Sequence, residues 1–105
     1  MKINLKFYLN TIYSKINPLG YAKKVGVNFP DGGLHIFGKV AWGSEPWIIS
    51  LGNNVYITDG VKFITHDGGT MLYRNIIPDL EITKPISVGN NVYFGNNVIV
   101  LGGLQ

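Results

Sequence analysis

The sequence predicts an all-β domain: a parallel β-helix of hexapeptide repeats, preceded by a short helix and interrupted by one protruding loop. The tetrapeptide Gly-Asn-Asn-Val occurs three times, at Gly52–Val55, Gly89–Val92 and Gly95–Val98, and the last two copies start six residues apart. Large apolar residues recur around these copies with the same spacing of six, and small β-branched residues follow most of them four positions later. The large residues are Leu51, Ile57, Phe63, Val88, Phe94 and Val100, and the small ones are Val55, Val61, Val92 and Val98. A six-residue period is typical of a hexapeptide β-helix and too short for ankyrin or leucine-rich repeats.

Composition limits the chain to one folded domain and excludes several classes of function. Its 105 residues are 46% hydrophobic and 14% charged, with fourteen glycines, which favours a folded, turn-rich protein. The absence of cysteine excludes disulfides, thiolate metal sites and a cysteine nucleophile. The net charge is only +3 and Arg74 is the one arginine, so no basic patch for nucleic acid is predicted. No apolar run approaches the ~18 residues of a membrane span and no signal-peptide pattern is present, so a cytoplasmic location is expected.

Residues 1–20 are predicted to form an N-terminal cap. Residues 3–16 carry apolar side chains four, three and four positions apart, at Leu5, Leu9, Ile12 and Ile16, which is one face of a helix. Pro18 and Gly20 are expected to end this helix. Terminal repeats of a solenoid need a cover, and a helix of this kind supplies one. A basic amphipathic helix lying on a membrane surface, through residues 2–24, is the alternative.

Residues 21–105 are predicted to form the repeat itself. In each rung the large residue points inward, and asparagine and glycine make the corners because both tolerate positive φ. A single rung cannot bury its apolar side chain, so rungs must stack. The first two tetrapeptide copies start 37 residues apart, one more than a multiple of six. A segment between them must therefore be looped out of the repeat, and we assign it to about residues 68–85.

The rungs occur together with Gly43-Ser44-Glu45-Pro46-Trp47 and with Phe63-Ile64-Thr65-His66-Asp67-Gly68-Gly69. In this combination the chain resembles the hexapeptide-repeat acyltransferases, in particular the sugar and polysaccharide O-acetyltransferases, over about residues 20–105. The resemblance implies a left-handed parallel β-helix that assembles as a homotrimer. It also implies active sites between neighbouring subunits, where acetyl-CoA lies along the coils. The position that matches the family's catalytic histidine is His66.

O-acetyl transfer requires a base that makes an acceptor hydroxyl nucleophilic, and a histidine with an ordinary pKa near 6.5 suits that role. We therefore predict His66 as the general base, which then gives its proton to the leaving thiolate. Asp67 either orients His66 or caps backbone amides at the corner, and the sequence leaves both open.

Four further residues are candidates for binding a saccharide acceptor. An aromatic and acidic cluster precedes the rungs, and sugars often bind against aromatic faces; the alternative for its tryptophans is packing against a loop. A basic side chain in the predicted loop either meets the phosphates of CoA or an acidic sugar or, as the alternative, is an ordinary solvated charge. These residues are Trp42, Glu45, Trp47 and Arg74.

Two expectations limit this assignment. One branch of the fold binds zinc through three histidines, but this sequence has only His35 and His66, so no metal site is predicted. Members of the family continue with further coils beyond the position of Gln105, so the chain is expected to be a C-terminally truncated member. The rival to the enzyme hypothesis is therefore an inactive β-helix fragment with only a structural or oligomerisation role.

Overall fold

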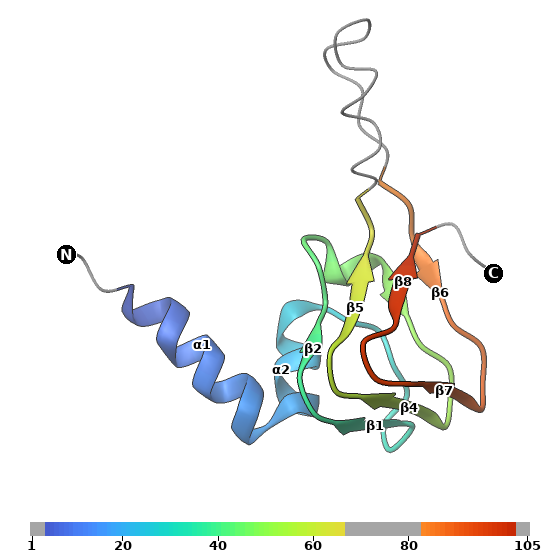
Figure 1. Cartoon of the computed structure of the whole chain (residues 1–105), viewed down its shortest axis with the longest axis horizontal. Coiled ribbons are helices and arrows are strands. Elements are labelled where there is room, and N and C mark those ends of the chain that lie inside the picture. The colour runs from blue at the N-terminus through green and yellow to red at the C-terminus, as the bar shows by residue number, and fades with distance from the viewer. Residues whose placement is uncertain (1–3, 67–82, 103–105) are drawn as a thin grey trace, which may run out of the picture.

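A computed structural model describes residues 4–66 and 83–102 of the chain. Within these ranges two helices precede eight short strands and one 3-10 helix (Figure 1). The helices are α1 (Leu5–Ile16), α2 (Pro18–Val25) and the 3-10 helix η1 (Pro46–Ile48). The strands are β1 (Leu34–Phe37), β2 (Val40–Ala41), β3 (Ile49–Ser50), β4 (Val55–Thr58), β5 (Val61–Ile64), β6 (Ile86–Ser87), β7 (Val92–Phe94) and β8 (Ile99–Leu101).

Three small sheets, all of them parallel, form the body of the molecule. Their strand orders are β1-β4-β7, β2-β5-β8 and β3-β6. The chain therefore runs through the three sheets in the same order each time, and we call one such circuit a pass: β1 to β3 form the first, β4 to β6 the second, and β7 and β8 the third. Strands of successive passes lie side by side (Figure 1). With its two N-terminal helices the described chain is a mixed structure rather than purely all-β, and its parallel sheets are compatible with the predicted β-helix.

The register of the strands shows where residues have been added to the repeat. Leu34 pairs with Val55, 21 positions later, whereas Val55 pairs with Val92, 37 positions later. Three six-residue rungs would make a pass of about 18 residues, so the first pass has a small insertion, which contains η1, and the second a large one. The large insertion begins and ends where His66 and Thr83 form an isolated antiparallel bridge.

The register thus places an insertion between His66 and Thr83, and the predicted bounds of the looped-out segment, about residues 68–85, stay a prediction. The regular hydrogen bonding resumes slightly earlier than expected, because the Lys84 amide already donates to the Thr65 carbonyl at 2.8 Å. Residues 67–82 lie outside the described part of the chain.

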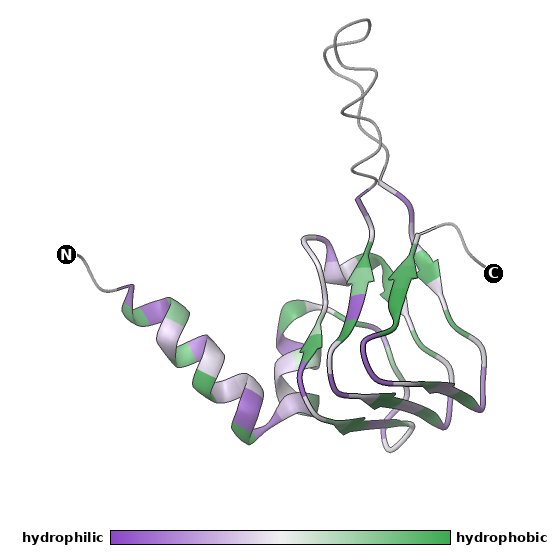
Figure 2. Ribbon diagram, in the orientation of Figure 1, coloured by the Kyte–Doolittle hydropathy of each residue, from purple (hydrophilic) through white to green (hydrophobic). Residues whose placement is uncertain are grey.

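The core is built from the repeating apolar positions. Ile57, Phe63, Val55 and Val61 are fully buried, and Leu51 is nearly so. Side chains alternate between buried and more exposed along β4 and β5, as a strand with one face on the core requires. Aromatic rings of successive passes contact one another in the core. The Phe63 ring stacks on Trp42 with ring centres 5.0 Å apart and meets Phe94 edge-on with ring centres 5.6 Å apart. Figure 2 shows the strands as the hydrophobic segments of the body.

The last pass buries its repeat positions less completely. Val100 is buried, while Val88, Val92 and Phe94 are only partly so. Val98, the small β-branched residue of the last tetrapeptide, is 38% exposed. Within the described residues β7 and β8 have a neighbouring strand on one side only, so their side chains lack the second layer that would cover them.

The predicted corner role of asparagine is confirmed in all three tetrapeptides. The second asparagine of each copy has positive φ, with values of 60° for Asn54, 57° for Asn91 and 63° for Asn97. Asn54 and Asn91 lie on the same corner in successive passes, and the Asn54 side-chain amide donates to Asn91 Oδ1 at 2.8 Å. Asparagine suits a stacked corner because it tolerates the left-handed backbone conformation and its side chain can form a hydrogen bond with the equivalent asparagine of the next pass.

The N-terminal segment differs from the expectation of one helix ended by Pro18 and Gly20. Asn17 is the C-cap of α1, where its backbone amide donates to the Tyr13 carbonyl. It is also the N-cap of α2, where its side-chain oxygen accepts a hydrogen bond from the Gly20 amide at 3.0 Å. Pro18 is then the first residue of α2, a position at which proline needs no backbone partner. The predicted end of the first helix before Pro18 is confirmed, since α1 stops at Ile16, but the sequence did not predict the second helix, which runs to Val25.

The two helices also contact the body differently. No residue of α1 is buried, whereas α2 buries Ala22 and packs Tyr21 and Val25 against the core. The contact that the cap was expected to make is therefore made by α2. The division into domains at residue 20 stays a prediction.

We predict that Asn54→Ala lowers the free energy of unfolding by about 1–3 kcal/mol, because alanine is disfavoured at positive φ and the bond to Asn91 is lost. Asn54→Gly, which accepts this φ, should cost less. Asn96→Ala is the control, since Asn96 is exposed and its φ lies outside the left-handed region. Urea unfolding measures all three, and equal effects of Asn54→Ala and Asn96→Ala would contradict the corner role.

Candidate functional site

His66 lies directly after Thr65 at the end of β5, where the second pass leaves the repeat. Its side chain is 34% exposed, so solvent reaches the imidazole although most of the side chain is covered. The antiparallel bridge to Thr83 fixes its backbone, and the Thr83 hydroxyl lies 3.2 Å from His66 Nδ1. The predicted position of His66 at the entrance to the looped-out segment is thus observed, while its catalytic role stays a prediction.

Glu45 approaches the same ring nitrogen from the preceding pass. Its Oε1 lies 3.7 Å from His66 Nδ1. The other carboxylate oxygen, Oε2, accepts hydrogen bonds from the hydroxyls of Ser44 (2.7 Å) and Thr65. Thr65 is itself buried, with 2% of its surface exposed. Both oxygens are therefore directed, one toward the buried hydroxyl and one toward the imidazole.

The strand register explains why these two residues meet. Glu45 precedes His66 by 21 positions, the same offset that pairs Val40 of β2 with Val61 of β5. Gly43 makes this close stacking possible at the point where the chain leaves β2. A Cβ at this position would lie 2.6 Å from the Phe63 carbonyl oxygen, and the φ of Gly43 is +79°. Only glycine fits such an approach without displacing the backbone.

The Glu45 carboxylate is stabilised in its ionised form. The hydrogen bond from the Thr65 hydroxyl is the largest cause that lowers the pKa of Glu45, followed by the bond from Ser44. Desolvation acts in the opposite direction, and the interaction with His66 adds a smaller lowering. A carboxylate that stays charged beside an imidazole orients the ring.

Among the described residues, both polar contacts of the His66 ring are with Nδ1. The nearby Glu45 carboxylate favours a proton on Nδ1, and the Thr83 hydroxyl is able to accept from that nitrogen; in this tautomer Nε2 carries the lone pair that accepts a proton. The arrangement is thus chemically suited to a general base acting through Nε2.

The other predicted site residues are placed differently. Trp42 lies in the core, 5% exposed and stacked on Phe63, as the packing alternative expected. Trp47 is 60% exposed, and its Cβ lies beside Gly26 after α2. Glu45 was predicted to bind the acceptor, but its observed contacts are with His66, Thr65 and Ser44. Asp67 and Arg74 lie outside the described residues, and acceptor binding by any of these residues stays a prediction.

Three hydroxyl residues of the site were missed from the sequence: Ser44, Thr65 and Thr83. Ser44 precedes Thr65 by the same 21 positions that separate Glu45 from His66. This 21-residue offset would have identified the contacts, but it follows from the length of the first pass. That length is set by the irregular stretch around η1.

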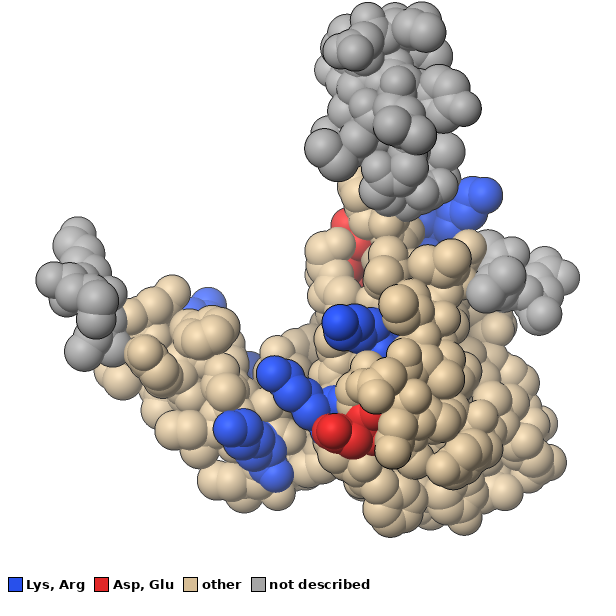
Figure 3. Space-filling view, viewed as in Figure 1, with Lys and Arg blue, Asp and Glu red and all other residues tan. Residues whose placement is uncertain are grey.

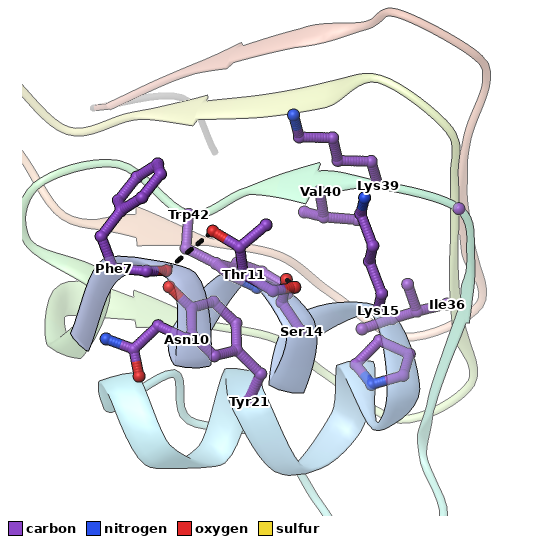
Figure 4. Close-up of a pocket in the computed structure, with 12 residues that line it drawn as sticks. Phe7, Asn10, Thr11, Ser14, Lys15, Tyr21, Ile36, Lys39, Val40 and Trp42 are labelled. Carbon is purple, nitrogen blue, oxygen red and sulfur yellow. Dashed lines mark hydrogen bonds between the residues drawn. The ribbon is translucent and has the colours of Figure 1, made fainter. Parts of the chain in front are cut away.

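A separate groove of about 710 Å³ lies between the N-terminal helices and the β1–β2 region (Figure 4). Its lining residues do not include Glu45, Thr65 or His66. Trp42 contributes to its wall, so the small accessible part of this ring faces the groove rather than His66.

The chain is similar to a curated protein over more than half of its length. It is 49% identical over 66 residues to Protein CapG of Staphylococcus aureus, a match that covers 63% of this chain and 38% of that protein. The chain thus spans well under half of the relative it matches. No protein-family model and no solved structure matches the chain.

Two further properties concern only residues 4–66 and 83–102. No helix there is long and apolar enough to cross a membrane. No group of three or more histidine, aspartate or glutamate side chains is placed to hold a metal ion. His35, the second histidine, stacks on Tyr56 with ring centres 4.5 Å apart, as an ordinary strand residue does.

We predict that Thr65→Val raises the pKa of Glu45, whereas Thr65→Ser, which keeps the hydroxyl, leaves it low. Because folding lowers this pKa, Glu45 adds stability above about pH 4.3, the range of an unfolded glutamate, and loses it as the pH falls through the folded value. Thr65→Val should therefore lower the free energy of unfolding at neutral pH, and this free energy should then fall less steeply as the solution is acidified.

Carboxyl titration by NMR and urea unfolding across pH test this prediction. Thr58→Val is the control, since it removes the hydroxyl of a half-buried threonine that donates to the Phe94 carbonyl at 2.8 Å rather than to Glu45. An unchanged Glu45 pKa in Thr65→Val would contradict the assigned cause.

Proposed function

We propose that this chain belongs to an acetyl-CoA-dependent O-acetyltransferase in which His66 is the general base and the acceptor is a hydroxyl of a saccharide or glycan precursor. The observation that carries the proposal is the pairing of His66 Nδ1 with the Glu45 carboxylate. The resemblance of the surrounding motif to sugar O-acetyltransferases supplies the reaction class. In this proposal the three parallel sheets are the faces of a left-handed β-helix.

The proposed reaction is a direct transfer. The acceptor hydroxyl gives its proton to His66 Nε2 as its oxygen forms a bond to the thioester carbonyl carbon. The carbon–sulfur bond then breaks, and the proton passes from Nε2 to the leaving thiolate. Glu45 and Thr83 hold the Nδ1 side throughout and stabilise the imidazolium that exists between the two proton transfers.

Acetyl-CoA as co-substrate and assembly into a homotrimer belong to the proposal as well. His66 is partly exposed where the chain leaves the repeat, which is compatible with a site shared with a neighbouring subunit. A neighbour would then provide the second wall that the acceptor and the thioester require.

A non-catalytic, assembling role is the second candidate. It is favoured by β8, where Ile99 and Leu101 are 56% and 51% exposed and one edge is unpaired within the described residues. An open strand edge with apolar side chains promotes pairing with another chain.

We predict that the protein releases free thiol from acetyl-CoA in the presence of a saccharide acceptor, and that His66→Ala lowers this rate by about 10²–10⁴-fold, the usual contribution of a general base. His35→Ala is the matched control, because it removes the other histidine, in β1, and should retain the activity. Thiol release measured with acceptor mixtures checks both variants.

Equal rates for His66→Ala and the wild type would contradict the role of His66. Absence of release with every acceptor, combined with self-association in sedimentation, would favour the assembling role.

A further inference from the structure

The apolar stripe of α1 points away from the body of the protein. Leu5, Leu9, Ile12 and Ile16 share one side of this helix and are 66%, 57%, 52% and 77% exposed. An amphipathic helix of a globular protein normally buries such a stripe against its own core. Here the stripe is left open although the helix is attached to a folded body.

The way in which α1 is attached causes this outward orientation. Its opposite side, with Asn10, Thr11 and Ser14, lines the groove that faces β1 and β2, and Phe7 and Lys15 line the same groove from the edges of that side (Figure 4). Lys24 of α2 also donates to Asn10 Oδ1 at 3.0 Å and lies over the Tyr13 ring at 5.6 Å. These contacts hold the polar side of α1 toward the protein, so the apolar side is the one presented to the surroundings.

The charges around the stripe are all of one sign. Residues 1–30 contain five lysines and no acidic residue. At about 100° per residue, Lys6 and Lys15 project on the two opposite flanks of the stripe, and both are exposed. On the face seen in Figure 3, the arm that α1 forms carries basic surface and no acidic surface.

We propose that α1 docks onto an anionic lipid surface and lies in its plane. The stripe would enter the boundary between headgroups and acyl chains, while the two flanking lysines reach back to lipid phosphates. Twelve residues of helix extend only about 18 Å, so α1 lies on the bilayer without spanning it. A second copy of this chain is the poorer occupant, because it would bring an equally basic helix against the first.

The test is co-sedimentation of the full chain with vesicles of phosphatidylglycerol and phosphatidylcholine in equal amounts, compared with pure phosphatidylcholine. Binding is expected to the anionic vesicles only and to weaken as salt screens the lysines. Lys6→Gln with Lys15→Gln should weaken binding about 30-fold, since each lysine near an anionic surface contributes about a factor of five. Leu9→Gln with Ile12→Gln should weaken it roughly 100-fold, since each buried aliphatic side chain contributes on the order of tenfold.

Each pair has a matched control elsewhere on the molecule. Lys39→Gln with Lys62→Gln removes the same charge from exposed positions of the body. Ile99→Gln with Leu101→Gln removes aliphatic side chains of nearly equal exposure from β8. Both control pairs should bind like the wild type. Circular dichroism verifies folding, which the α1 pairs should retain because none of their residues is buried.

Three results would overturn the proposal. The first is no binding to anionic vesicles at low salt. The second is an equal loss of binding in the control pairs, which would indicate general charge or adhesion. The third is a change of oligomeric state in Leu9→Gln with Ile12→Gln without lipid, which would show that a second copy covers the stripe.

Discussion

The in-register stacking of equivalent corners is the constraint on which the rest of the structure depends. Parallel strands of successive passes lie side by side only if each corner turns in the same place and with the same conformation. Asn54 and Asn91 meet this requirement through positive φ and through the hydrogen bond between their side chains. With the corners aligned, inward residues such as Ile57 and Phe63 fall into one continuous core.

The same register brings the candidate site together. Trp42 stacks on Phe63, and further along the two passes Glu45 reaches His66, each pair separated by 21 positions. The insertion after His66 does not disturb this arrangement, because Thr83 returns to pair with His66 at the base of the insertion. A long segment can therefore leave the scaffold while the residues at its base remain held by the repeat. The proposed catalytic geometry therefore rests on the 21-residue register between the first and second passes.

The repeat made the local features of the fold predictable from the sequence. A six-residue period identifies both the inward positions and the asparagine corners, because each follows from its own rung. The 37-residue spacing similarly predicted that a segment leaves the repeat, and placed His66 beside it. Features that depend on neighbouring passes were not predictable in this way. The contact of Glu45 with His66 requires the length of the first pass, and the exposure of Val98 depends on what covers the last one. The continuation of helix beyond Pro18 was missed because proline is disfavoured inside a helix but is well suited to begin one.

In the proposed reaction Glu45 acts through His66 and not independently. A double-mutant cycle on thiol release from acetyl-CoA, with Glu45→Gln and His66→Ala alone and combined, tests it most directly. We expect Glu45→Gln to slow release in the wild-type background and to have no further effect when His66 is already alanine. Independent, additive losses, or an unchanged rate in Glu45→Gln alone, would contradict it.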